Sequence, residues 1–207
     1  MEVTQKGKYG YLTITGDDGK VFAISDLHLG HANIISHCNH RPFNSVEDMD
    51  ETIIANWNSV VGENDIVINL GDFVWRSDQL QKILNRLNGR QIFVIGNHDR
   101  RSSVEKAEKH TDKFLFVGDM AEVRYNGFRF LACHYPLASW SGNYNDLYHI
   151  YGHTHDNEQT IEAIGSPKKY NCCVELNDYT PQLLMDIKER IDEKVKLSKN
   201  SSDLQVE

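Results

Sequence analysis

Short, continuous apolar runs recur in the first half of the chain, and each has the length of a strand that is buried on both faces. These runs cover residues 21–24, 66–68 and 92–95. Between the first two, residues 46–61 place apolar side chains at helical spacing, and Asn44 or Ser45 can cap the start of that helix. The alternation of strand and helix predicts a layered α/β fold.

Two shorter helices are predicted further along the chain. Ser77 opens the first, which has apolar residues along one side and Gly89 just past its end. Residues 102–110 form a weaker third helix. Each of the two follows an apolar run, so the strand–helix rhythm continues.

The N-terminus and the second half are richer in strand and turn signals. Residues 8–15 alternate in polarity and then turn at Asp17-Asp18-Gly19, which predicts a hairpin leading into residues 21–25. A mobile N-terminal arm is the alternative for this segment. Residues 123–133 are predicted to form a second hairpin, because Asn126-Gly127 is a strong signal for a two-residue turn.

The end of the chain predicts one more strand and one more helix. The strand covers residues 170–176, and Thr180-Pro181 caps a helix that runs to about Leu197. Residues 1–197 contain no repeat or interdomain linker and are predicted to be a single domain, followed by a disordered tail at residues 198–207. The predicted architecture is a four-layer α/β/β/α sandwich, with two facing sheets and helices outside them.

Side chains that bind metals follow five apolar, strand-like runs, the last of which is Ile150-Tyr151. In chain order these segments are Asp26-Leu27-His28, Gly71-Asp72, Gly96-Asn97-His98-Asp99, His134 and Gly152-His153-Thr154-His155. Open α/β folds place their chemistry outside the carboxyl ends of strands, so the five segments are expected to meet at one rim. Imidazole and carboxylate groups suit Mn, Fe, Co, Ni or Zn, and the pattern needs no thiolate.

In content and order, these segments resemble the signature of the calcineurin-like metallophosphoesterase superfamily, which is D-x-H, G-D, G-N-H-D/E, H and G-H-x-H. The resemblance implies a two-metal site in which Asp72 bridges both ions, as the two oxygens of a carboxylate allow. The other ligands would be Asp26, His28 and His155 for the first ion, and Asn97, His134 and His153 for the second.

The same resemblance implies roles for the polar residues of the third segment. His98 would be the acid near the oxygen of the leaving group, and Asp99 would orient His98 and stabilise its charge. Asn97 would contact the phosphate as well as its ion. Two ions about 3.5–4 Å apart would clamp the attacking and leaving oxygens of a phosphoryl displacement.

The residues around the first segment resemble one branch of this superfamily more closely. Residues 25–31, followed by Asn33-Ile34-Ile35 and Arg41-Pro42-Phe43, are similar to a branch of short, single-domain bacterial and phage phosphoesterases. That branch has no settled physiological substrate, so the likeness narrows the fold more than the function.

Five residues near these segments have two interpretations each. His31 and Asn33 either contact the substrate or pack within their own loop. Arg41 either holds a phosphate with a bidentate fork or pairs with an acidic residue of the next helix. Tyr135 and Trp140 either stack on a base or sugar or anchor their loop.

The remaining histidines and the cysteines have no predicted function. These histidines, expected on the surface or in the core, are His37, His40, His110 and His149. The four cysteines form no disulfide framework, which favours reduced thiols and a cytoplasmic location. Met1 to Lys6 contain no apolar signal segment, and no run reaches the roughly 18 apolar residues of a membrane helix.

Length and charge limit the partners. A chain of 207 residues with 40% hydrophobic residues can form one domain with a substantial core. Its net charge of −8 argues against an extended nucleic-acid surface, which needs a basic stripe. The expected partner is a small phosphorylated or nucleotide substrate, with no membrane partner, and the oligomeric state is not predicted.

The predicted function is a metal-dependent phosphoric ester hydrolase with two divalent ions, Mn²⁺ first and Fe, Zn, Ni or Co as alternatives. A metal-bridging hydroxide would attack the phosphorus of, most simply, a phosphodiester. The alternatives are a phosphomonoesterase or phosphoprotein phosphatase, and a nucleotide pyrophosphatase. A more remote alternative is a non-catalytic scaffold with the same fold, which is disfavoured because every ligand position and His98 are filled.

Overall fold

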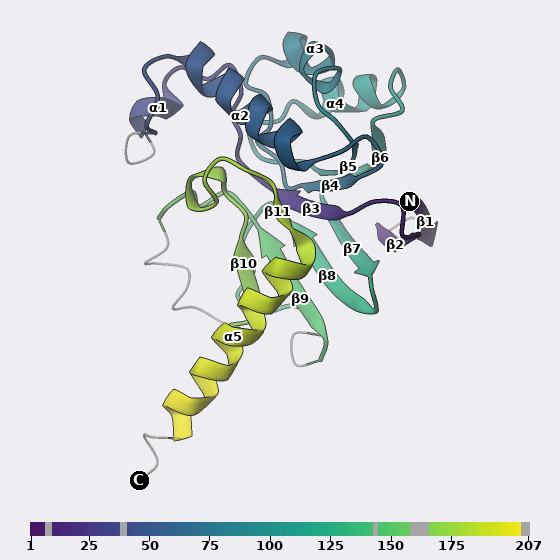
Figure 1. Ribbon diagram of the computed structural model, residues 1–207, viewed down its shortest axis with the longest axis vertical. Helices are drawn as coiled ribbons and strands as arrows, with labels where there is room; N and C mark the ends of the chain where they lie inside the picture. The colour runs from purple at the N-terminus through teal and green to yellow at the C-terminus, as the bar shows by residue number, and fades with distance from the viewer. Residues whose placement is uncertain (7–9, 38–40, 143–144, 158–165, 204–207) are drawn as a thin grey trace.

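The computed structural model describes the chain except residues 7–9, 38–40, 143–144, 158–165 and 204–207. Two β-sheets face each other and are flanked by helices, which confirms the predicted α/β sandwich (Figure 1). None of the described helices is long and apolar enough to cross a membrane.

The first sheet has five strands in the order β11-β3-β4-β5-β6. Strands β3 to β6 are parallel, and β11 pairs antiparallel with β3 at the edge. The three central strands carry the apolar runs of the sequence and are buried on both faces, as such runs predict. The bounds are β3 Val21–Ile24, β4 Ile66–Asn69, β5 Arg90–Val94, β6 Phe114–Gly118 and β11 Gln182–Leu183.

The second sheet has six strands in the order β1-β2-β7-β8-β9-β10. Strands β7 and β8 form the predicted hairpin, in which Asn126 and Gly127 have φ angles of 48° and 81°. Strands β8, β9 and β10 run parallel to one another, so their carboxyl ends share one edge. The bounds are β1 Glu2–Lys6, β2 Tyr11–Thr15, β7 Met120–Tyr125, β8 Phe128–Cys133, β9 Leu147–Tyr151 and β10 Lys169–Asn171.

Helices cover the outer face of the five-stranded sheet (Figure 1). Their bounds are α1 Ile34–His37, α2 Val46–Val60, α3 Leu80–Leu84 and α4 Arg101–Glu108. Helix α2 begins as predicted, because the Ser45 side chain accepts a hydrogen bond from Asp48 N at 3.1 Å. Trp57 of α2 is fully buried and packs in one apolar cluster with Phe22 and Phe93 of the sheet.

A second apolar cluster fills the space between the two sheets, and the last helix packs against it. Ala23 and Ile68 of one sheet and Val123 and Phe130 of the other belong to it. Helix α5, Leu184–Asp203, adds Leu184, Ile187 and Ile191 to this cluster. It contacts β3 and β11 of one sheet and β10 of the other. The two sheets are therefore held at a fixed spacing, which fixes the rim where their strands end.

The predicted hairpin between residues 8–15 and 21–25 is wrong. Strand β2 pairs with β1 and β7, whereas β3 lies in the other sheet. The polarity pattern explains the difference. In β2 only Leu12 and Ile14 face the core, as in a strand with one exposed face, whereas all of β3 is buried.

Three further boundaries differ from the prediction. The helix at Ser77 is one 3₁₀ turn followed by α3, which ends at Leu84, well before Gly89. The predicted strand at 170–176 ends at Asn171. The last helix starts after β11 and continues to Asp203, so residues 198–203 are helical instead of belonging to a tail. Two-residue strands and single 3₁₀ turns leave too short a pattern to be recognised.

Candidate metal centre

The five segments with metal-binding residues meet at one rim of the sandwich, as predicted. They follow β3, β4 and β5 in one sheet and β8 and β9 in the other. Two groups of acidic and histidine residues there have donor atoms within 4.8 Å of one another. They are Asp26, His28 and His155, and Asp26, Asp72 and His134.

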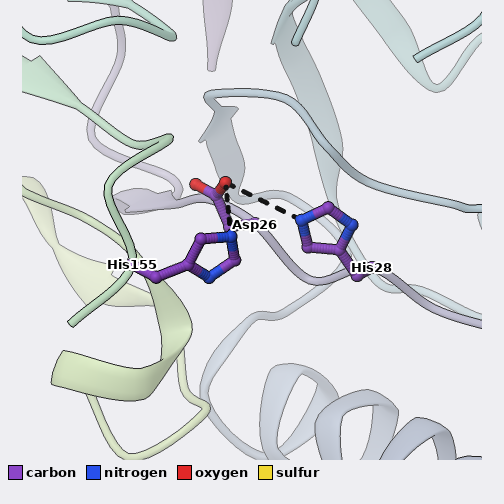
Figure 2. A group of neighbouring side chains, drawn as sticks. All are labelled: Asp26, His28 and His155. Carbon is purple, nitrogen blue, oxygen red and sulfur yellow. Dashed lines mark ion pairs between the residues drawn. The ribbon is translucent and has the colours of Figure 1, made fainter. Parts of the chain in front are cut away.

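The two oxygens of Asp26 have separate environments. Oδ2 accepts hydrogen bonds from Ser25 Oγ, from His153 N at 2.9 Å and from Cys173 Sγ at 3.1 Å. Oδ1 is buried without a hydrogen-bond partner and lies 3.6 Å from His155 Nε2 and 3.9 Å from His28 Nε2 (Figure 2). The protein thus fixes one oxygen and leaves the other facing two imidazole nitrogens.

Asp72 lies between the two predicted ligand sets. Its Oδ2 is 3.6 Å from His28 Nε2 and also 3.6 Å from His134 Nε2. Its Oδ1 accepts a hydrogen bond from His98 N at 2.8 Å, which holds the carboxylate in place. One oxygen of Asp72 is therefore within reach of two ions, the geometry that the bridging role requires.

The predicted ligands of the second ion converge on one another. Asn97 Oδ1 lies 2.8 Å from His134 Nε2 and 2.9 Å from His153 Nδ1. His134 is buried, whereas Asn97 and His153 are exposed. The second position is consequently the more accessible to solvent.

These donor sets fit divalent metal ions. Donors bound at about 2.0–2.2 Å in a tetrahedral site lie about 3.3–3.6 Å apart, close to the 3.6–3.9 Å between the Asp26 and Asp72 oxygens and the imidazole nitrogens. Asp26 Oδ1 and His28 Nε2 are buried without a hydrogen bond, an arrangement that is costly unless an ion binds them. The carboxylate and imidazole donors suit first-row transition metals.

Two histidines are oriented by acceptors on their Nδ1 atoms. His134 Nδ1 lies 2.7 Å from the Leu70 carbonyl oxygen, and His155 Nδ1 lies 2.8 Å from Glu175 Oε1. Carbonyl and carboxylate oxygens can only accept, so Nδ1 carries the proton in each ring. In this tautomer Nε2 carries the lone pair, which is the form in which a histidine binds metal.

Left-handed backbone is concentrated at this site. Among the described residues other than glycine, eight have positive φ, and five of these are predicted ligands. They are Asp26 at 59°, His28 at 51°, Asp72 at 52°, His153 at 72° and His155 at 48°. Such conformations are strained in residues with a Cβ and cluster at functional sites.

Gly96 and Gly152 provide the space that this packing needs. A Cβ on Gly96 would collide with Asp72 Oδ1, and one on Gly152 would collide with Ser25 Oγ and Asp26 Oδ2. The glycines of the third and fifth segments therefore let other parts of the chain approach both carboxylates closely.

Burial shifts the pKa values of two predicted ligands, and both shifts favour the binding of a metal cation. Burial, with added repulsion from His155 and Arg41, lowers the pKa of His28 to about 2, which keeps this imidazole neutral. Burial and then the charge of Asp26 raise the pKa of Asp72 to about 6. Two close carboxylates repel each other, and divalent ions between them would remove this cost.

His98 stands beside the ligands but is not one of them. Its ring is exposed, and its centroid lies 5.4 Å from that of His28. The predicted partnership with Asp99 is wrong. Asp99 accepts hydrogen bonds from the backbone N–H groups of Asp72, Phe73 and Gly96 at 2.8–3.0 Å, so both of its oxygens bind backbone. Asp99 therefore stabilises the loop that carries Asp72 through these hydrogen bonds.

Arg41 does not face the substrate, which contradicts the predicted phosphate clamp. The side chain is buried, and its guanidinium donates to the carbonyl oxygens of Asp26 and Leu27 and to Glu175 Oε1. The alternative, an acidic partner in the next helix, also fails, because Glu175 lies in a 3₁₀ turn after β10. Arg41 instead connects the first segment to the carboxylate that orients His155.

The aromatic candidates have different environments. Trp140 is buried and donates from Nε1 to the Leu147 carbonyl oxygen at 3.1 Å, so it anchors its loop. Tyr135 is 46% exposed and lies edge-on to His153 and His134, at centroid distances of 4.7 and 5.1 Å. Tyr135 thus borders the second metal position, and its stacking role stays a prediction.

The histidines without a predicted role agree with that expectation where they are described. His149 is buried in a hydrogen-bonded position, with Nδ1 3.0 Å from the Leu131 carbonyl oxygen. His37 and His110 are exposed, and His40 lies outside the described residues. His31 stacks on Trp75 of the loop after β4, and Asn33 is exposed, so a substrate contact by either residue stays a prediction.

Four residues of the site were missed by the sequence analysis. Ser25 and Cys173 hold Asp26, Glu175 orients His155, and Trp75 lies beside His98. Ser25 and Trp75 adjoin recognised segments, and this proximity is the one signal that could have identified them. Cys173 and Glu175 lie in a stretch that was interpreted as an ordinary strand.

Replacement of Glu175 tests its positioning role. Hydrogen bonds from His155 and the charge of Arg41 outweigh burial and lower the pKa of Glu175, so it is an anion at neutral pH. We expect Glu175→Gln to weaken binding of one ion about 10–100-fold and to leave the other nearly unchanged. Calorimetric titration of metal into metal-free protein measures this, with exposed Glu189→Gln as the control. Equal affinities in wild type and variant would refute the role.

Comparison with known proteins identifies the family. A model of the calcineurin-like phosphoesterase superfamily domain matches residues 20–171, which include all five segments. The chain belongs to this superfamily, and its membership supports metal-dependent phosphate ester hydrolysis in general.

The names of three similar proteins state no activity. An uncharacterized protein of Methanocaldococcus jannaschii is 37% identical over 190 residues, which cover 89% of this chain and 98% of the relative. The Gene 66 protein of Mycobacterium phage L5 is 37% identical over 79 residues, 36% of this chain and 37% of the phage protein. A protein of unknown function from Aquifex aeolicus has a crystal structure with a TM-score of 0.64 and 27% identity, covering 83% of this chain and 99% of that one.

Proposed function

We propose that this protein is a phosphodiesterase that uses two divalent ions, Mn²⁺ first among them. The observation that carries the proposal is the position of Asp72, whose Oδ2 is equidistant, at 3.6 Å, from His28 Nε2 and His134 Nε2. A single carboxylate oxygen between two sets of donors supports a dinuclear site better than one ion alone.

When bound, the ions would supply a water whose pKa is lowered to about 7 and positive charge for the phosphate oxygens. The protein's own contribution is position and proton transfer. Asp26 and Asp72 are fixed by hydrogen bonds to Ser25, Cys173 and the His98 backbone, so the donor atoms need no rearrangement. Preorganised groups of this kind cost no reorganisation during the reaction.

Asn97 and His98 are the groups placed to contact the substrate. Both are exposed at the rim, and the Asn97 amide lies between two histidine ligands. In the proposed hydrolysis, a water oxygen bonds to phosphorus and the bond from phosphorus to the leaving oxygen breaks. The leaving oxygen keeps the electron pair and takes a proton from His98, while the attacking water gives up its own proton to solvent.

A diester fits an open site. Asn97, His98 and His153 are exposed, as is Tyr135 at the edge of the second metal position. Such a rim leaves room for a substituent on each side of the phosphorus, whereas a monoester needs room on one side only. Monoester and pyrophosphate hydrolysis remain the competing activities.

The test is a reconstitution. Metal-free protein is reloaded with Mn, Fe, Co, Ni or Zn, and each form is assayed on bis(p-nitrophenyl) phosphate, p-nitrophenyl phosphate and a nucleoside diphosphate ester with a pyrophosphate bond. We expect no turnover without metal and the highest kcat/KM for the diester with Mn²⁺. A higher kcat/KM for the monoester or the pyrophosphate would replace the proposed activity, and no turnover with any metal would favour the scaffold.

A further inference from the structure

Trp75 forms a rigid ring stack beside the metal centre. It lies three residues after Asp72, and its backbone N–H donates to the Leu29 carbonyl oxygen at 2.9 Å. Its indole lies flat against the His31 imidazole, with ring centroids 3.7 Å apart and an angle of 3° between the planes. The backbone hydrogen bond and the stacked ring together fix the orientation of the indole.

The indole is exposed although one face is covered. Trp75 is 44% exposed, whereas the other two tryptophans, Trp57 and Trp140, are 0% and 8% exposed. His31 covers one face of the ring, so the exposed area belongs to the rest of the indole, which also borders His98. The uncovered part of the indole is therefore accessible to a ligand.

The exposed indole is adjacent to the predicted acid. The Trp75 and His98 ring centroids are 5.4 Å apart, at an angle of 44°. His98 is in turn 5.4 Å from His28, whose Nε2 faces Asp26 and Asp72. The indole therefore lies on the side of the metal centre where the leaving group would depart.

We propose that Trp75, supported by His31, is a stacking platform for a nucleobase, so that the substrates are nucleotide phosphoesters with the base on the leaving-group side. The inference rests on the proposed function, since His98 marks that side. Stacking on an aromatic ring accepts any base, because every base has a flat π-face. It also needs no basic surface, which suits a chain with net charge −8.

Fluorescence gives a test that does not depend on turnover. Zn²⁺-loaded protein is titrated with adenosine 5′-monophosphate or ribose 5-phosphate, which share a sugar phosphate and differ in the base. We expect the nucleotide to quench tryptophan emission, because Trp75 is the exposed tryptophan, and ribose 5-phosphate to leave it unchanged. Calorimetry should show about 5- to 150-fold tighter binding of the nucleotide, the range of base–aromatic stacking.

Three variants identify the residue responsible. Trp75→Leu should lose the quenching and bind both ligands with the affinity of ribose 5-phosphate. Trp75→Phe should keep most of the preference, because it keeps a flat ring. Tyr11→Leu, which removes an exposed aromatic ring on β2, should behave as wild type. Equal affinities for the two ligands in wild type, or an unchanged preference in Trp75→Leu, would overturn the proposal.

Kinetics separates this inference from the proposed function. Adenosine 2′,3′-cyclic phosphate and glycerol 1,2-cyclic phosphate are cyclic diesters with and without a base. We expect Trp75→Leu to raise KM for the first about tenfold more than KM for the second. Equal kcat/KM values for the two diesters in wild type would refute the platform and leave the phosphodiesterase intact. If neither diester is hydrolysed, the proposed function fails, and the fluorescence result still decides whether a base stacks on Trp75.

Discussion

Asp72→Asn is expected to reduce metal content at both positions and to abolish hydrolysis. The side-chain oxygen of the new amide can still accept the hydrogen bond from His98 N, so the amide nitrogen takes the place of Oδ2. That nitrogen has hydrogens and no free lone pair, and it would face His28 Nε2 and His134 Nε2 where Oδ2 lies now. Metal analysis after dialysis, together with kcat on the best diester, measures both effects.

The control for this variant is Asp186→Asn, which makes the same chemical change at an exposed position of α5. It should retain two ions and full activity. Two tightly held ions in Asp72→Asn would disprove the bridging role, and loss of one ion alone would assign Asp72 to a single metal.

His98→Ala is expected to keep both ions and to lose activity. The His98 backbone N–H donates to Asp72 Oδ1, and alanine keeps that group. The His98 ring lies against the ring of His28 but is assigned to neither ion. The rate should fall about 10²–10⁴-fold, the usual contribution of a positioned acid. The loss should be smaller for nitrophenolate, a good leaving group that needs little protonation. An equal loss for good and poor leaving groups would mean that His98 positions the phosphate, and loss of metal would make it a ligand.

The pH profile provides a second check on His98. Metal ligands must be deprotonated, so activity falls on the acidic side. Burial of His28, and partial desolvation of the exposed His153 together with repulsion from His134, lower the pKa values of these two residues, so both stay neutral to lower pH. The acidic limb should therefore lie at or below pH of about 6, the value to which burial raises the pKa of Asp72. An alkaline limb that is present in wild type and absent from His98→Ala would identify His98 as the acid.

Local patterns predicted most of the fold. The buried runs at β3, β4 and β5 and the helix at α2 carry their signal within a few neighbouring residues, and the Ser45 cap marks where α2 begins. The hairpin at β2 was misassigned because strand alternation indicates that a strand exists and not which strand it pairs with.

The meeting of the five segments was predictable for the same reason, and the residues that support them were not. Each metal-binding segment is short and follows a strand, so topology alone gathers the five at one rim. Arg41 and Glu175 are 134 residues apart, and no sequence pattern predicts that these two charged side chains will pair. The role of Asp99 was mistaken because adjacency to His98 suggested a partnership, whereas its oxygens bind backbone groups of other segments.

Five of the predicted ligands have a left-handed, strained backbone, so residues that would give this chain its activity also lower its stability. His155, at φ 48°, carries a cost of roughly 1–2 kcal/mol that glycine would not. A glycine there would remove a metal donor and relieve strain in a single substitution. The four other predicted ligands with positive φ carry the same kind of backbone strain, so a substitution that silences this site can also relieve strain in the fold. An inactive descendant of this protein would therefore lose its chemistry without losing its shape.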